Sequence, residues 1–259
     1  MSELNYGLEG QVIVVTGASR GIGYGCAQFL AQQGAKLVLT GRKPERLEAA
    51  VESLGLASSD VVAQTVNAAD RDGAFALAAV ALEKFGRIDG LVANAQTFRP
   101  VTPLEDVTQH DLDVVFNTGP AGTLWAMQSV LPAMKERGRG RIVTMGSAVG
   151  LTGGPGYGPY SASNEAIRSL TRTAAREWGR YGVLVNCVCP ASVGHRMPPS
   201  DADPARAEVY KAMYADHPLG RDGDLVTDIG AAVGFLLSDG CSYLTGQTLM
   251  VDGGGIMRA

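Results

Sequence analysis

The chain has 259 residues, 46% of them hydrophobic, and a formal net charge of -4 at pH 7. Because no basic excess is available to displace counterions, nucleic-acid binding is excluded as a main activity. The N-terminus lacks a basic region followed by an apolar core, and no apolar run approaches the ~18 residues that cross a bilayer. We therefore expect a cytoplasmic protein with no membrane partner.

The chain is predicted to be a single domain over residues 1–259, since its length suits one α/β core and no repeat or low-complexity linker interrupts it. Cysteines occur at four scattered apolar positions without metal-ligand spacing, which predicts buried free thiols and no metal site. They are Cys26, Cys187, Cys189 and Cys241.

Short runs rich in valine, isoleucine and leucine alternate with longer segments of helical periodicity. The apolar runs, which predict strands, lie at 11–16, 36–40, 61–66, 88–93, 140–146, 183–189 and 247–251. The predicted helices include 71–85, 111–134, 162–178 and 225–237. Because the strands lack polar alternation, we expect both faces of a parallel sheet to be covered by helices. The predicted fold class is α/β, with a doubly wound parallel sheet.

The first predicted strand runs directly into a glycine-rich turn at Thr16–Gly23, and a helix follows that ends near Gly34. Glycines at this place permit a tight turn and let backbone N–H groups at a helix start approach a pyrophosphate. The pattern therefore predicts a dinucleotide site. Its expected contacts are Gly17, Ser19, Arg20, Gly21, Ile22 and Gly23.

Several ordered motifs resemble those of the short-chain dehydrogenase/reductase family over nearly the whole chain. The family's Thr-Gly-x-x-x-Gly-x-Gly loop matches Thr16–Gly23 in full, and its Asn-Ala-Gly segment is similar to 94–96, which includes Asn94. Other matches are Asn117, Ser147, Tyr160 and the C-terminal segment 244–254. The resemblance implies a Rossmann fold that binds a nicotinamide dinucleotide.

Charge at the end of the second predicted strand bears on the choice of cofactor. A carboxylate there would bind the NAD ribose, whereas this chain has Arg42, which with Arg20 could pair with the 2′-phosphate of NADP. NADP is therefore predicted over NAD, the alternative being that both arginines are solvated surface residues. Asn67 occupies the position where the family usually has an aspartate that contacts adenine.

In the family, a tyrosine exchanges the proton with substrate, a serine holds the substrate oxygen, and a lysine binds the nicotinamide ribose. The resemblance gives the first two roles to Tyr160 and Ser147, and a water-linked proton path to Asn117. Asn164 stands where the lysine would be. Positions four apart on a helix share a face, so we expect Asn164 to point into the same cleft as Tyr160. Tyr157 is expected to pack in the loop, and Ser147 could alternatively serve only as a turn or capping residue.

The loss of a lysine should affect the two reaction directions unequally. A unit cation ~5 Å from a phenolate stabilises it by roughly 3 kcal/mol at an effective dielectric of 20. Without that charge the Tyr160 phenol keeps its proton at neutral pH, which suits donation to a forming alkoxide and hinders alcohol oxidation. We expect a reductase that oxidises slowly unless the pH is high.

Further departures from the family pattern cluster near the nicotinamide end. Gln96 replaces a glycine, Ala191 follows Pro190 where Pro-Gly is usual, and His195 replaces a threonine or serine that holds the carboxamide. His195 either supplies an acid, base or cation near the ring or is an exposed loop residue, and the second interpretation is favoured. Arg168 lies ~12 Å along the helix from Tyr160 and is expected at the surface or in a subunit contact.

The sequence thus predicts an NADP-dependent oxidoreductase that interconverts a carbonyl compound and a secondary alcohol and favours reduction. A substrate lid is expected near 191–221, and the resemblance implies a homotetramer or homodimer. Two alternatives stay open. One is an NADP(H)-binding sensor or scaffold without redox turnover. The other is a repurposed non-redox catalyst similar to halohydrin dehalogenases, against which the intact glycine loop counts.

Overall fold

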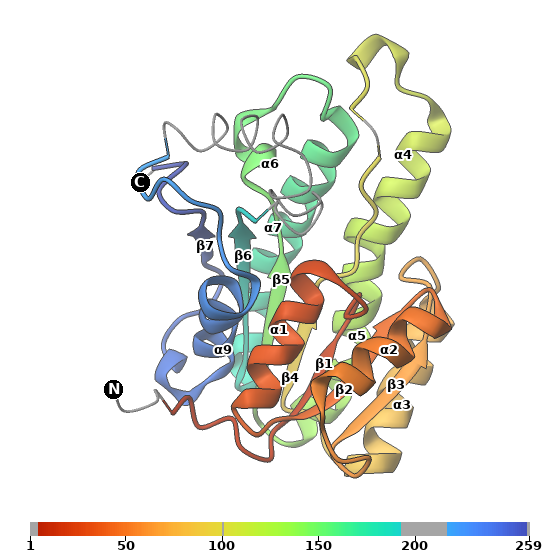
Figure 1. Cartoon of the computed structure of the whole chain (residues 1–259), viewed down its shortest axis with the longest axis vertical. Helices are drawn as coiled ribbons and strands as arrows, with labels where there is room; N and C mark the ends of the chain where they lie inside the picture. The colour runs from red at the N-terminus through yellow and green to blue at the C-terminus, as the bar shows by residue number, and fades with distance from the viewer. Residues whose placement is uncertain (1–4, 100, 193–216, 258–259) are drawn as a thin grey trace.

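The computed structural model of the chain describes residues 5–99, 101–192 and 217–257. Within them, seven strands form one parallel sheet in the order β3-β2-β1-β4-β5-β6-β7 (Figure 1). The strands are β1 (Val12–Val15), β2 (Lys36–Gly41), β3 (Val61–Thr65), β4 (Gly90–Ala93), β5 (Gly140–Met145), β6 (Val183–Pro190) and β7 (Thr248–Val251). All seven predicted strands and the doubly wound parallel arrangement are confirmed.

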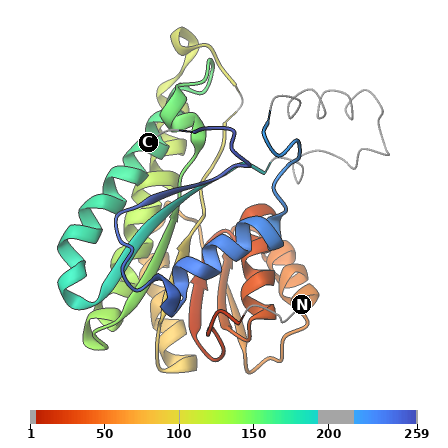
Figure 2. The same cartoon turned by 90° about the vertical axis from the view of Figure 1, so that its left-hand side faces the viewer.

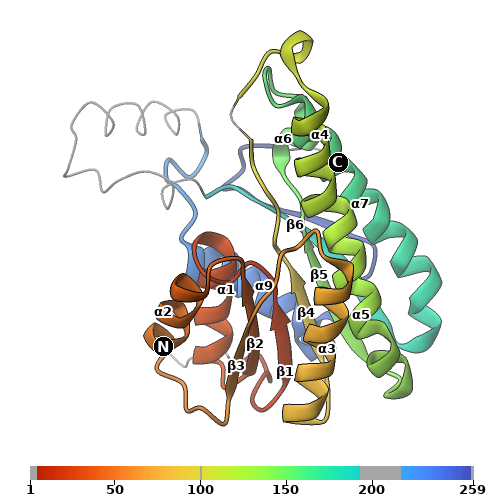
Figure 3. The same cartoon turned by 90° about the vertical axis from the view of Figure 1, so that its right-hand side faces the viewer.

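Helices cover both faces of the sheet (Figures 2 and 3). On one face lie α1 (Gly21–Gln32), α2 (Pro44–Leu54) and α9 (Ala231–Leu237), and on the other lie α3 (Arg71–Phe85), α5 (Gly122–Glu136) and α7 (Gly158–Trp178). Two more helices, α4 (Gln109–Phe116) and α6 (Ala148–Thr152), reach beyond the carboxyl ends of the strands. The short helical turns are η1 (Leu104–Asp106), η2 (Asn117–Ala121), η3 (Gly179–Tyr181), η6 (Leu225–Gly230) and η7 (Asp239–Cys241).

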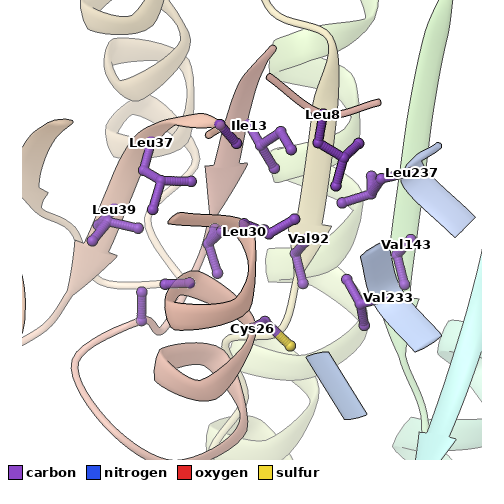
Figure 4. Close-up of a cluster of buried hydrophobic side chains, with 14 of the residues drawn as sticks. Leu8, Ile13, Cys26, Leu30, Leu37, Leu39, Val92, Val143, Val233 and Leu237 are labelled. Carbon is purple, nitrogen blue, oxygen red and sulfur yellow. The ribbon is translucent and has the colours of Figure 1, made fainter. Parts of the chain in front are cut away.

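The core consists of two apolar layers, one on each side of the sheet. Along β1, Ile13 and Val15 face the layer that contains α1 and α9, while Val12 and Val14 face the layer of α3, α5 and α7. Figure 4 shows the first layer, where side chains from α1 meet those of β1, β2 and β4. This two-sided burial explains why the inner strands lack polar alternation. The edge strands β3 and β7 are only partly buried.

Helix boundaries differ from the periodicity in three places. The predicted helix 111–134 is divided into α4 and α5 by the π-type turn η2, which contains Pro120, a residue without an N–H to donate. The predicted helix 162–178 begins earlier, at Gly158, with Pro159 in its first turn, where proline is tolerated. The predicted helix 225–237 is α-helical only from Ala231.

The four cysteines are free and buried, as predicted. Burial raises the pKa of the Cys26 thiol to about 12, which leaves it inert at neutral pH. Among the described residues, no helix is long and apolar enough to cross a membrane. Within the same ranges, no group of three or more His, Cys, Asp and Glu side chains could hold a metal ion.

Candidate active site

The glycine loop connects β1 to α1 at the carboxyl edge of the sheet. Gly17 and Gly21 have φ of +68° and +60°, a backbone region that side chains other than glycine rarely adopt. A Cβ on Gly23 would overlap the Asn94 amide nitrogen, so a third glycine is required for close approach. No side chain in the described ranges caps the start of α1 at Arg20, and its first N–H groups remain available to a phosphate.

Asn94 holds this loop in place from the end of β4. Its side-chain amide donates to the carbonyl oxygens of Thr16 and Gly17 over 3.0 and 3.3 Å. In return, Thr16 Oγ1 accepts from the backbone N–H groups of Asn94 and Ala95, each at 3.0 Å. The Asn94 side chain therefore lies beneath the loop, and its predicted contact with the cofactor stays a prediction.

The residues predicted around the adenosine end gather beside β2. Ala18 donates to the carbonyl of Thr40 over 2.7 Å, and a Cβ on Gly41 would lie 3.1 Å from that of Ser19. Arg20 and Arg42 are both exposed at this edge. Asn67 is exposed after β3, where its side-chain oxygen accepts from the Ala69 N–H over 3.2 Å.

Ser147 and Tyr160 come from neighbouring elements. Ser147 follows β5 and caps α6, where its Oγ accepts from the Val149 N–H over 3.3 Å. Tyr160 lies in the first turn of α7, which packs against α6. Since β1, β4, β5 and β6 are adjacent and parallel, the segments after them meet at one edge of the sheet. The structure thus brings the serine and tyrosine to the same edge as the glycine loop.

Asn164 lies one helical turn after Tyr160 and is fully buried. Its Nδ2 donates to the Tyr160 carbonyl oxygen over 2.8 Å, and Ser163 Oγ donates to the same carbonyl over 2.9 Å. Its Oδ1 is buried without a hydrogen-bond partner among the described residues. The amide nitrogen is therefore hydrogen-bonded back onto the helix, and the amide oxygen remains a buried acceptor without a partner among the described residues.

Asn117, predicted to belong to the proton path, is exposed at the start of η2. Gly119, two residues later, is buried and faces α7, where a Cβ would lie 3.7 Å from Ser163 and 3.9 Å from Ile167. Two residues correspond to about half a helical turn, so when Gly119 faces α7, Asn117 must face away. The side of η2 that faces α7 is therefore occupied by Gly119, and the water-linked proton path that the resemblance assigns to Asn117 stays a prediction.

Gln96 lies on the segment after β4, which is hydrogen-bonded to both the glycine loop and η2. The preceding residue, Ala95, is bonded to Thr16, and the following residue, Thr97, donates to Thr118 Oγ1 over 3.0 Å. The Gln96 side-chain oxygen is buried and has no partner in the described ranges. Gln96 and Asn164 thus each have a buried side-chain oxygen without a hydrogen-bond partner among the described residues.

A small cleft beside Tyr160 has an aromatic wall that the sequence did not reveal. The ring of Phe98 lies 5.2 Å from that of Tyr160, edge to face at 83°, and 5.7 Å from that of Tyr157. The cleft is also lined by Thr102, Val107 and Pro159. Phe98 is 37% exposed, and the only sequence signal is a lone aromatic residue shortly after Asn94.

One ion pair borders this cleft. Arg99 Nε donates to Asp111 over 2.8 Å, and Thr108 Oγ1 donates to the same carboxylate over 2.6 Å. The hydrogen bonds from Thr108 and Arg99 lower the pKa of Asp111 to about 2. The carboxylate stays ionised at neutral pH, and the charge of Arg99 is balanced within the pair.

Arg168, expected at the surface or in a subunit contact, is partly buried with a side chain 14% exposed, and the subunit contact stays a prediction. It pairs with Glu165 at 2.6 Å and donates to Thr248 of β7 over 3.2 Å. Its charge is therefore balanced by the Glu165 carboxylate. Behind it, the Cys187 and Cys189 thiols fill the space that Gly146 leaves without a Cβ. A hydrogen bond with Cys189 lowers the pKa of Cys187, and the same contact raises that of Cys189.

The far end of the site is described only in part. Pro190 ends β6 beside Val251, and Ala191 donates to the Val251 carbonyl over 2.9 Å and accepts from Gly223 over 3.2 Å. His195 and most of the predicted lid at 191–221 lie outside the described residues.

Comparisons with known proteins agree with this geometry. A family model described as enoyl-(acyl carrier protein) reductase matches residues 17–255. The chain is 36% identical to a gluconate 5-dehydrogenase of Gluconobacter oxydans, over 96% of each chain. It is 35% identical to a 12alpha-hydroxysteroid dehydrogenase of a Clostridium species, over 95% of this chain and 96% of the relative. The crystal structure of levodione reductase superposes with a TM-score of 0.87 at 31% identity, covering 95% of this chain and 98% of that one.

Proposed function

Because the chain belongs to the short-chain dehydrogenase/reductase family, whose members are oxidoreductases, we propose that it interconverts a carbonyl compound and a secondary alcohol with NADP and favours reduction. One observation carries the proposal. The glycine loop at Thr16–Gly23, Ser147 and Tyr160 share one edge of the sheet, where a dinucleotide and a carbonyl substrate would meet.

The residues present fit a dinucleotide. The glycine loop leaves a cradle without side chains, and the N–H groups at the start of α1 suit a pyrophosphate. The buried acceptors of Gln96 and Asn164 suit the hydroxyl groups of the nicotinamide ribose, and their unsatisfied state supports this role. When bound, the dinucleotide supplies or accepts the hydride. Asn94 supports the loop from below, and Pro190 borders the nicotinamide end.

NADP is preferred over NAD on the basis of charge. Arg20 and Arg42 are exposed beside β2, where they can donate charge-assisted hydrogen bonds to a 2′-phosphate. Gly41 lets Ser19 approach this position closely. Asn67, exposed after β3, would contact the adenine.

Proton transfer takes place at the phenol of Tyr160. In reduction, its Oη donates a proton to the substrate oxygen while Ser147 Oγ holds that oxygen by a hydrogen bond. Asn164 places an uncharged amide where the family has a lysine, so no cation at that position stabilises the phenolate. We therefore propose that alcohol oxidation, which uses the phenolate as a base, is the slower direction.

An NADP(H)-binding protein without redox turnover is a second candidate, and two observations favour it. Asn164 turns onto its own helix, and Gly119 faces α7, so both positions lack groups for a proton relay. A non-redox catalyst is a weaker alternative, because the glycine loop is complete.

A titration with NADPH followed by a panel of ketones tests these candidates. We expect wild type to bind NADPH and to reduce at least one ketone, and Tyr160→Phe to lose roughly 100- to 10,000-fold in rate with its NADPH affinity retained. Tyr157→Phe removes the neighbouring hydroxyl but keeps its ring, and should retain most of the rate. Binding without turnover in wild type, with turnover gained in Asn164→Lys, would instead favour the second candidate.

We further propose a single domain over 1–259, with residues 191–221 as the substrate lid, that assembles as a homotetramer or homodimer. A cytoplasmic location is proposed as well, since four free buried thiols suit a reducing compartment.

The substrate is a small to medium carbonyl compound. The two relatives are named for gluconate and for a hydroxysteroid, so their names leave the shape of this substrate open.

A further inference from the structure

We propose that Phe98 determines substrate specificity and that the site accepts ketones carried on an apolar ring system in preference to short polar carbonyl compounds. This inference rests on the proposed carbonyl reduction. Its basis is the position of the Phe98 ring, edge to face with Tyr160 at a centroid distance of 5.2 Å. A substrate whose oxygen reaches the Tyr160 hydroxyl must place its body beside this ring.

Phe98 is held in place on both sides, although it belongs to a loop. Before it, Thr97 donates to Thr118 Oγ1 over 3.0 Å. After it, Arg99 pairs with Asp111 at 2.8 Å, and Thr102 donates to the Gly156 carbonyl over 3.0 Å. These hydrogen bonds attach the residues on both sides of Phe98 to η2, α4 and the turn before α7. The ring therefore has a defined position against the site rather than a random one at the surface.

The cleft next to Phe98 offers little to a polar substrate. Its two charges, Arg99 and Asp111, are paired with each other. The remaining surface is mainly aromatic and aliphatic, with Tyr157, Val107 and Pro159 as its walls. A short hydroxyketone would gain few hydrogen bonds on this side and would leave the aromatic wall in water.

The apolar surface continues outward from Phe98 along the same segment. Val101 and Leu104 are 56% and 74% exposed. Both side chains pack against the start of α7 and the turn before it, where Gly156 and Gly158 have no Cβ to obstruct them. A fused ring system could cover both the Phe98 ring and this strip, whereas a short chain would cover neither. Aromatic rings favour such flat apolar partners by edge and face contacts.

Matched substrates and variants test the proposal. We would measure kcat/KM with NADPH for 2-decalone, a bicyclic ketone, and for hydroxyacetone, in wild type, Phe98→Leu and Phe98→Ala. Phe98→Ala should lower kcat/KM for 2-decalone by roughly 10- to 100-fold, mainly through KM, and leave hydroxyacetone nearly unchanged. Phe98→Leu should lie between. Phe235→Ala is the control, because Phe235 is also 37% exposed but lies on α9.

Three results would overturn the proposal. These are an equal fall for both ketones in Phe98→Ala, a wild-type preference for hydroxyacetone, and an equal fall in Phe235→Ala. If wild type reduces neither of these two ketones, ring recognition can still be measured by binding, separately from the ketone panel that tests the proposed function. Saturation-transfer NMR with 2-decalone should then show a signal that Phe98→Ala loses and Phe235→Ala keeps, and signals of equal size would reject the specificity role.

Discussion

The side-chain amide of Asn164 donates a hydrogen bond to the backbone carbonyl oxygen of Tyr160 over 2.8 Å. Asn164 is therefore fully buried, uncharged and hydrogen-bonded to the backbone of the residue one helical turn before it on α7. Asn164 thus brings no charge to this turn of α7, and its amide nitrogen is hydrogen-bonded within the helix.

Asn164→Lys should accelerate alcohol oxidation at pH 7 more than ketone reduction. A cation about 5 Å from the phenolate at an effective dielectric of 20 is worth roughly 3 kcal/mol, or about 100-fold. pH–rate profiles in both directions measure the effect. Wild-type oxidation should keep rising at high pH, and Ser169→Lys, which adds the same charge on the exposed side of α7, should not change the profile. A wild-type oxidation rate already maximal at pH 7 would contradict the argument.

Arg42→Asp should reverse the preference between the two dinucleotides. Loss of a charge-assisted hydrogen bond costs about 1.5–3 kcal/mol, so the Kd for NADPH should rise roughly 10- to 100-fold while that for NADH falls. Fluorescence titration with each cofactor measures both constants. Arg46→Asp on α2 makes the same charge change at another exposed position and should have little effect. Unchanged NADPH affinity in Arg42→Asp would remove Arg42 from the cofactor site.

Gly23→Ala should weaken both the fold and cofactor binding, because the added Cβ would overlap the Asn94 amide and the Gly17 carbonyl. Overpacking of this kind costs about 1–3 kcal/mol, or several degrees in Tm for a chain of this length. Gly179→Ala is the control, since Gly179 has φ of -55° and open space around its Cβ. Thermal melts with and without NADPH would show the difference, and identical melts for both variants would disprove the close-packing argument.

Asp111 should contribute to acid stability through its hydrogen bonds to Thr108 and Arg99. Its pKa is lowered to about 2 in the folded protein, below the ordinary value of about 3.9. The contribution is therefore complete above about pH 4 and is lost as the pH falls toward 2. Urea unfolding midpoints from pH 5 to 2 should decline less steeply in Asp111→Asn than in wild type. Asp113→Asn on the same helix serves as the control, and parallel curves for wild type and Asp111→Asn would argue against the role.

The fold could be predicted well because buried positions carry apolar residues, and their spacing is visible in the sequence. The inner strands are apolar on both faces, as the two-layer core requires, and the glycine loop has a conformation that few other residues tolerate. Helix ends were less certain, since η2 and η6 have the periodic pattern of a helix but not its regular hydrogen bonding.

The site was harder to predict because it depends on contacts between distant segments. Asn117 matched a motif, but which residue of that turn faces α7 is set by the π-type geometry, and that residue is Gly119. Arg168 was placed by its distance along α7 from Tyr160, although its partners lie on β7 and at Glu165. Phe98 carries no local pattern at all, since its role arises from a neighbour more than sixty residues away.

The wide turn at Asn117–Ala121 also affects how the site could change in evolution through the insertion or deletion of one residue. A π-type turn accommodates one residue more than an α-helical turn, so a single codon gained or lost here would rotate α4 by about 100° relative to α5. Because α5 carries the buried side chains, the core would keep its packing. A different side chain of the turn would then face α7. Insertion or deletion at this point could therefore exchange the residue that faces α7 without any substitution in the core.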